Sequence, residues 1–143
     1  MIIAATHQIQ ADLTQLTDIR EFIRDTAAAL GTESTAIPDV VLAANEAVTN
    51  IIVHGYRDQP GTIEIEVGYE ADDLIIRLRD QAFIFNPNTV LPPDLTLPLE
   101  ERPLGGLGVY LTKKLMDQVL HRVTSRGGNE LTLVKKNVIR NIS

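Results

Sequence analysis

The hydrophobic period of the chain changes at Gly55, and this change limits the folds that the chain can adopt. Before Gly55, apolar residues have the spacing of a buried helical face: Val41, Ala44, Val48, Ile51 and Ile52. After Gly55, Ile63, Ile65 and Val67 alternate with more polar residues, which is typical of a half-exposed strand. A helix that ends at His54-Gly55, with Gly55 in the left-handed position after it, therefore leads into a strand.

The other elements follow from the same patterns. We expect a strand over 2–9, a helix from Asp12 or Thr14 to about Leu30, and a helix starting near Pro38 with Ser34 or Thr35 as cap candidates. Further along the chain we expect a strand over 74–80 after a turn at 71–73, and a helix after the glycines at 105–108 whose apolar positions run to Val119. Two more strands are expected over 120–126 and 130–136. The prolines within 86–104 exclude a long helix or strand there.

This order favours an α+β fold. Paired strands with helices between them predict a two-layer α/β sandwich, in which a mixed, mostly antiparallel sheet has helices on one face. A doubly wound parallel sheet would need strict alternation of strand and helix, which is absent. With 143 residues and no repeat or boundary signal, we expect one domain over 1–143.

Composition excludes several classes of function. The net charge of −6 and the sequence pI of about 5.0 argue against a direct nucleic-acid binder and against a basic membrane-surface protein. The absence of cysteine excludes disulfides and thiolate metal sites. Residues 1–10 lack the pattern of a secretory signal, so we expect a soluble cytoplasmic domain.

A polar stripe runs along the helix before Gly55. Glu46, Asn50 and His54 recur at every fourth residue, so they share one face. A carboxylate can accept a proton, and an amide oxygen one turn away can bind Mg²⁺. On spacing alone an ordinary solvated face is the commoner explanation, but this face carries no Lys or Arg to pair with Glu46. His54, at the helix end, is better explained as a cap or packing residue.

Two further segments have a residue pattern suited to binding a ligand. Asp80 ends a buried strand, where a carboxylate can accept a hydrogen bond from an adenine amino group, and Phe83 and Phe85 are candidates for core or pocket wall. Gly105-Gly106-Leu107-Gly108 precedes a helix, whose free N–H groups suit phosphate. A turn residue and a plain loop-to-helix joint are the structural alternatives. Neither the P-loop pattern nor the dinucleotide fingerprint is matched.

In this order the motifs resemble those of the GHKL ATPase/kinase superfamily, and in particular of the bacterial anti-sigma factor serine/threonine kinases. The resemblance covers nearly the whole chain, with four matching stretches: Asn45–Tyr56 (the N box), Asp80–Pro87 (the first glycine box), Leu104–Asp117 (the second) and Gly127–Lys136 (the last hairpin). It implies the histidine kinase-like ATPase fold, with residues 86–104 as the ATP lid.

The resemblance also implies roles for individual residues. Glu46 would be the catalytic acid–base residue, and Asn50 would hold Mg²⁺. Asp80 would read the adenine, in a pocket that includes position 82. The remaining ATP-binding positions are in the second glycine box: Gly106, Leu107, Gly108 and Val109.

The implied activity is transfer of the ATP γ-phosphoryl group to a serine or threonine of an anti-anti-sigma partner with a STAS domain, together with binding of a sigma factor. The oligomeric state is left open, with a homodimer as one alternative.

One departure from the family pattern keeps a second function open. The first glycine box usually reads Asp-x-Gly, whereas this chain has Asp80-Gln81-Ala82. A Cβ at position 82 is expected to crowd the adenine pocket or to require a backbone angle that alanine tolerates poorly. The alternative is a non-catalytic binding module of the same fold that regulates a partner by sequestration. Asn129 and Glu130 stand where relatives often have a threonine near the adenine, and no role is assigned to them.

Overall fold

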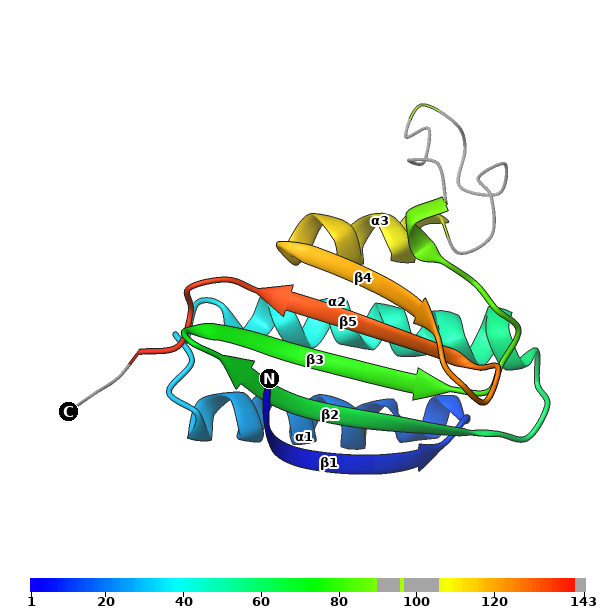
Figure 1. Cartoon of the computed structure of the whole chain (residues 1–143), viewed down its shortest axis with the longest axis horizontal. Helices are drawn as coiled ribbons and strands as arrows, with labels where there is room; N and C mark the ends of the chain where they lie inside the picture. The colour runs from blue at the N-terminus through cyan, green and yellow to red at the C-terminus, as the bar shows by residue number, and fades with distance from the viewer. Residues whose placement is uncertain (90–95, 97–105, 141–143) are drawn as a thin grey trace.

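The computed structural model describes residues 1–89, 96 and 106–140, and its central element is one antiparallel sheet (Figure 1). Within these residues the sheet has five strands in the order β1-β2-β3-β5-β4. Their bounds are Ile2–Gln10 (β1), Thr62–Glu70 (β2), Asp73–Asp80 (β3), Gln118–Val123 (β4) and Asn129–Lys135 (β5). Every pairing between neighbours is antiparallel, so the parallel component allowed by a mixed sheet is not seen among them.

The helices lie on one face of this sheet, so the expected α+β two-layer sandwich is confirmed (Figure 1). The helices and the short helical turns have these bounds: Leu13–Gln15 (η1), Leu16–Ala29 (α1), Ile37–Asn50 (α2), Ile51–Tyr56 (η2, a wide π turn), Pro87–Thr89 (η3) and Gly106–Leu115 (α3). Asp12 caps η1 by accepting a hydrogen bond from Thr14 N, as expected. The cap position of α2 is Ala36, which makes no side-chain bond, rather than Ser34 or Thr35.

The core lies between the helices and the sheet. Alternate residues of β2 and β3 point inward and are fully buried: Ile63, Ile65, Val67, Leu74, Ile76 and Leu78. They pack with the apolar stripes of α1 and α2: Ile19, Ile23, Val40, Ala44 and Val48. Each large aliphatic side chain contributes about 1.5–3 kcal/mol by leaving water, so these two stripes dominate the driving force for folding.

The opposite face of the sheet carries a cluster of ion pairs. Glu130 Oε2 lies 2.9 Å from Arg79 Nε, and Glu130 Oε1 lies 2.8 Å from Arg122 Nε. Arg79 also reaches Glu66, with 2.6 Å between Nη1 and Oε1. Glu66 and Glu130 are both buried, although the alternation pattern had placed Glu66 on an exposed face. The arginines on neighbouring strands explain this difference, because their side chains lie over the carboxylates.

The helix before Gly55 ends differently from the expectation. The chain continues through Gly55 in the wide turn η2, and Arg57, with φ of 53°, is the residue in the left-handed region. Gly55 therefore does not serve as the helix-ending glycine. Tyr56 fixes the end of η2, because its hydroxyl donates to Thr62 O at 2.7 Å and accepts from Gln81 N at 2.8 Å.

The last third of the chain also differs in its boundaries. Helix α3 ends at Leu115, and Val119 belongs to β4 rather than to the helix. The cause is Asp117, whose N–H donates to Val134 O at 2.8 Å and draws the chain onto the sheet. Strand β4 ends at Val123, because the next residue opens a turn in which Gly127 N donates to Thr124 O at 2.9 Å.

We predict that Tyr56→Phe lowers the free energy of unfolding by about 1–2 kcal/mol, because it leaves Thr62 O and Gln81 N without their shared partner. Urea denaturation measures this. Tyr69→Phe is the matched control, since among the described residues the Tyr69 hydroxyl has no hydrogen-bond partner, and its stability should stay within about 0.5 kcal/mol of the parent. Equal effects of the two substitutions would contradict the proposed anchor.

We also predict a pH dependence from Glu130. The guanidinium of Arg122, aided by Arg79, lowers the Glu130 pKa to about 2 from its usual 4.5. The stability that this carboxylate contributes is therefore complete above about pH 4.5 and is lost as the pH falls towards 2. We expect about 2 kcal/mol, reduced from the full shift because Arg122 is largely exposed to solvent.

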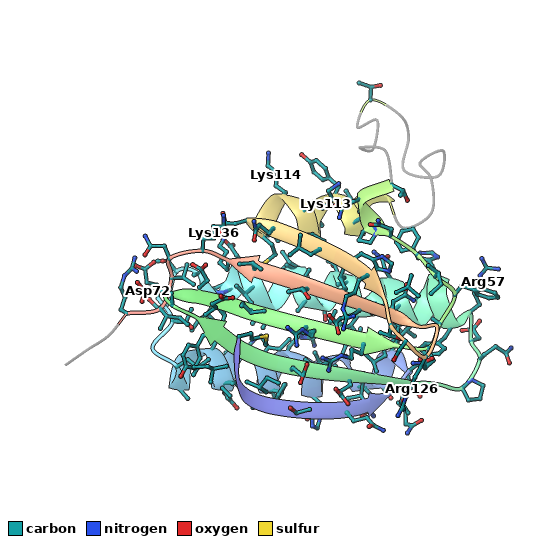
Figure 2. All side chains as sticks on the ribbon, in the orientation of Figure 1. Arg57, Asp72, Lys113, Lys114, Arg126 and Lys136 are labelled. Carbon is teal, nitrogen blue, oxygen red and sulfur yellow. The ribbon has the colours of Figure 1, made fainter. Side chains whose placement is uncertain are left out.

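The measurement is urea denaturation of the parent and of Glu130→Gln between pH 2.5 and 7. The substitution should lower stability at pH 7 and flatten the profile below pH 4.5. The control is Asp72→Asn, at the exposed turn between β2 and β3 (Figure 2), which should leave the profile unchanged. A profile of Glu130→Gln that is parallel to that of the parent would refute the assignment.

Candidate functional site

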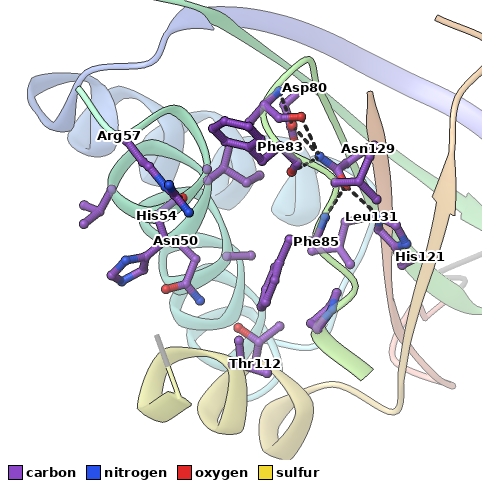
Figure 3. Close-up of a pocket in the computed structure, with 18 residues that line it drawn as sticks. Asn50, His54, Arg57, Asp80, Phe83, Phe85, Thr112, His121, Asn129 and Leu131 are labelled. Atoms are coloured by element: carbon purple, nitrogen blue, oxygen red, sulfur yellow. Dashed lines mark hydrogen bonds between the residues drawn. The ribbon is translucent and has the colours of Figure 1, made fainter. Parts of the chain in front are cut away.

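A cavity of about 500 Å³ opens between the end of α2, the segment after β3, and α3 (Figure 3). This volume lies within the usual range for small-molecule sites. Its lining is mostly apolar, with Asn50 and His54 on the helix side and Asp80, Asn129 and His121 on the sheet side. The structure therefore brings the polar stripe of the helix and the acid at the end of the strand to one cavity.

Glu46 and Asn50 meet the glycine-rich start of α3. A methyl carbon at Gly108 would lie 3.1 Å from Asn50 Nδ2 and 3.3 Å from Glu46 Oε2. A side chain at position 108 would therefore crowd both groups, and glycine leaves them room beside the start of this helix. Asn50 lines the cavity, while Glu46 lies one turn earlier on α2 and is partly exposed.

Thr112 holds α3 in this position. Its side chain is buried, and the hydroxyl lies 3.1 Å from Ala43 O on α2 and 3.0 Å from Gly108 O on its own helix. The hydroxyl can donate to either carbonyl, so one polar contact joins the two helices beside the cavity. Lys113 and Lys114 are exposed on the outer side of the same helix (Figure 2).

The other second-glycine-box residues have different positions. Gly106 is the first residue of α3, Leu107 is exposed, and Val109 is buried and lines the cavity. Of the expected lid over 86–104, the structure describes only 86–89 and 96, of which Pro87 lines the cavity. The rest of that expectation lies outside the described residues.

Asp80 lines the cavity on the sheet side and is 4% exposed. Its Oδ1 accepts hydrogen bonds from Ala82 N and from Asn129 Nδ2, each at 2.9 Å. Burial raises the pKa of this carboxyl group above its usual value, and the two hydrogen bonds only partly offset that effect. Among the described residues nothing donates to Oδ2, so this oxygen is available to a ligand donor such as an amino group.

Asn129 joins the segment after β3 to the sheet. Its amide nitrogen donates to Asp80 Oδ1 at 2.9 Å and to Phe83 O at 3.0 Å. Its amide oxygen accepts from Phe85 N at 3.0 Å and lies 2.7 Å from His121 Nε2. Figure 3 shows these bonds converging on one side chain, which therefore sets the conformation of residues 80–85.

Ala82 adopts a backbone conformation that alanine tolerates. It is absent from the described residues with positive φ, and its N–H is held by Asp80. The expected backbone conflict is therefore wrong. Ala82 is buried, with 9% of the residue exposed, and it lines the cavity without closing it.

Other lining residues either had no predicted role or had a different one. His54 lines the cavity rather than acting only as a cap, and His121 lies across from it on β4. Phe83 and Phe85 belong to the pocket wall rather than to the core, which confirms one of the two alternatives expected for them. The Arg57 guanidinium lies 4.9 Å from the centre of the Phe83 ring. Asn129 faces Asp80 in the pairing of β3 with β5, which no local pattern could reveal.

The donor set limits what kind of metal could bind. No group of three or more His, Cys, Asp or Glu side chains converges on one point among the described residues. Asn50 alone is a weak ligand, but Mg²⁺ typically takes one or two protein ligands and fills its shell with phosphate oxygens and water. The residues therefore suit Mg²⁺ brought by a nucleotide rather than a permanent metal centre.

We predict that Asn129→Ala lowers the free energy of unfolding by about 1–3 kcal/mol, because Phe85 N and Phe83 O lose a buried partner. The same change should raise the pKa of Asp80 further, since one donor to the carboxylate is removed. Urea denaturation and carboxyl NMR titration measure the two effects. Asn88→Ala, which removes a single exposed hydrogen bond, is the control and should shift neither by a comparable amount.

No helix among the described residues is both long and apolar enough to cross a membrane.

Comparison with known proteins places the chain in a family. Residues 9–135 match the histidine kinase-like ATPase domain. The serine-protein kinase RsbW of Bacillus mycoides is 35% identical over 120 residues, which span 80% of this chain and 75% of that protein. RsbW of Bacillus cereus strain AH187 is 40% identical over 91 residues, or 59% and 57% of the two chains.

A solved structure supports the fold. The crystal structure of the RsbU and RsbW domains of a Mycobacterium tuberculosis protein superposes with a TM-score of 0.63 at 18% identity. It matches 98% of this chain, which spans 35% of that longer one. On these grounds the chain belongs to the histidine kinase-like ATPase family and is a relative of the RsbW serine-protein kinases, as its motifs had indicated.

Proposed function

We propose that this protein is an anti-sigma regulatory factor with ATP-dependent serine/threonine kinase activity towards an anti-anti-sigma partner with a STAS domain. The observation that carries the proposal is the cavity that has Asn50 at one side and Asp80 at the other. The names of the RsbW relatives support the kinase class. The proposal includes one domain over 1–143, a cytoplasmic location and binding of a sigma factor.

Different side chains would bind different parts of the nucleotide. Asp80 Oδ2 would accept a hydrogen bond from the adenine amino group, while Asn50 would bind Mg²⁺ at the phosphates. The backbone from Gly106 to Val109, at the start of α3, would face the phosphates with its free N–H groups. Bound Mg²⁺ neutralises charge on the phosphates during transfer.

Glu46 would serve as the acceptor for the proton of the partner's hydroxyl group. In the transfer, the serine or threonine oxygen bonds to the γ-phosphorus as the bond to the β–γ bridging oxygen breaks, which yields ADP and a phosphorylated partner. The position of Glu46 beside Gly108 and one turn from Asn50 supports this role, since the proton acceptor must lie near the phosphates.

A non-catalytic module of the same fold is the alternative, and Ala82 is the residue that favours it. The ordinary backbone of Ala82 and the open cavity beside it support nucleotide binding instead. The two functions differ in one measurable property, because only the kinase transfers phosphate.

We predict that Glu46→Gln slows phosphate transfer by about 10²–10⁴-fold while Mg·ATP affinity changes less than about threefold, since the proton acceptor is lost and the binding groups remain. Transfer of labelled γ-phosphate to a purified STAS-domain partner and calorimetric titration measure the two quantities. Asn50→Ala should instead weaken Mg²⁺-dependent binding. Asp39→Asn, an acid in the first turn of α2, is the control for charge removal. Absence of transfer by the parent chain, with ATP bound, would leave the sequestration module.

A further inference from the structure

We propose that Gly55 and Ala82 form a matched small-residue pair that sets the width of the nucleotide cavity. One methyl group fits between η2 and the segment after β3, and a second does not. This inference rests on the proposed nucleotide site, and it assigns Gly55 a positioning role: the residue touches no reacting group but keeps two walls of the cavity at the right separation.

The contact between the two residues carries the inference. A methyl carbon at Gly55 would lie 2.9 Å from the Ala82 methyl carbon, which is closer than two carbon atoms can pack. The next nearest atoms, Ile51 Cγ2 at 3.9 Å and Asn50 O at 4.0 Å, are at ordinary contact distances. The conflict therefore concerns position 82 alone.

Rotation of a side chain cannot relieve the conflict. Both methyl carbons are attached directly to the backbone, so one of the two segments would have to move. Ala82 is held at its N–H by Asp80 Oδ1, and the two segments are joined nearby by the 2.8 Å hydrogen bond from Gln81 N to the Tyr56 hydroxyl. A shift of either segment would strain these bonds.

A shift of either segment would change the shape of the cavity, because Gly55 and Ala82 both line it. Gly55 is one residue from His54 and five from Asn50, on the helix side. Ala82 is two residues from Asp80, whose carboxylate lines the cavity on the sheet side (Figure 3). Separating the two walls would move the proposed adenine-binding and metal-binding groups apart. The absence of a side chain at Gly55 thus leaves room for the methyl group of Ala82.

Four proteins test the pair: the parent, Gly55→Ala, Ala82→Gly, and the double variant in which the methyl group changes walls. We predict that Gly55→Ala weakens Mg·ATP binding at least tenfold and that Ala82→Gly stays within about threefold of the parent. The double variant should recover to within about threefold of Ala82→Gly. Calorimetric titration with Mg·ATP gives the affinities, and the cycle isolates the coupling between the two positions.

If the parent binds Mg·ATP, two outcomes would overturn the inference: an affinity of Gly55→Ala equal to that of the parent, or a double variant as weak as Gly55→Ala. The matched control is Ala71→Gly, at the opposite end of β3, where φ is 51° and a glycine fits; it should leave the affinity unchanged.

Urea denaturation without nucleotide separates this inference from the proposed function. Gly55→Ala should lower the unfolding midpoint and the double variant should restore it, even if the parent chain binds no ATP. If the parent binds no ATP but the unfolding midpoints still show coupling between positions 55 and 82, the proposed function alone is refuted. If the effects of the two substitutions are additive both in Mg·ATP affinity and in the unfolding midpoint, the proposed coupling between Gly55 and Ala82 is refuted.

Discussion

The antiparallel pairing of β3 with β5 is the interaction on which the site depends. These strands occupy the middle of the sheet, and their register places Asp80 opposite Asn129. A slip of one residue would turn Asn129 to the other face of the sheet, because side chains alternate. The pairing thus joins a carboxylate at the end of β3 to an amide at the start of β5, and the amide orders residues 80–85.

The helical layer completes the cavity by a second close contact. Helix α3 lies beside Glu46 and Asn50 at Gly108, where a side chain would crowd both groups, and the buried Thr112 hydroxyl holds α3 close to α2. Gly55 and Ala82 make a comparable approach on the opposite side. Small residues therefore lie where the walls come together, and polar groups lie where the walls separate. This arrangement leaves an apolar cavity with a few polar groups at its margins, which is the usual form of a small-molecule site.

The two faces of the sheet contribute to stability in different ways. The helical face buries the aliphatic side chains that drive folding, while the other face orders arginine and glutamate residues into a cluster with a strongly lowered Glu130 pKa. A buried carboxylate is tolerated there because two guanidinium groups lie within 3 Å of it. The cluster also crosses β2, β3, β5 and β4, so it reinforces the register on which the cavity depends.

The sequence by itself determined the element order, the α+β class, the family, and the candidates Glu46, Asn50, Asp80 and Gly108. These depend on local spacing, hydrophobic period and motif order, which a single chain displays directly. Tertiary structure alone decided the roles of Asn129, His121 and Gly55. Their neighbours are distant in sequence: the β3–β5 register sets Asp80 against Asn129, and the packing of η2 sets Gly55 against Ala82. Local patterns contain no information on such pairings, because register and packing distances arise only when the whole core assembles.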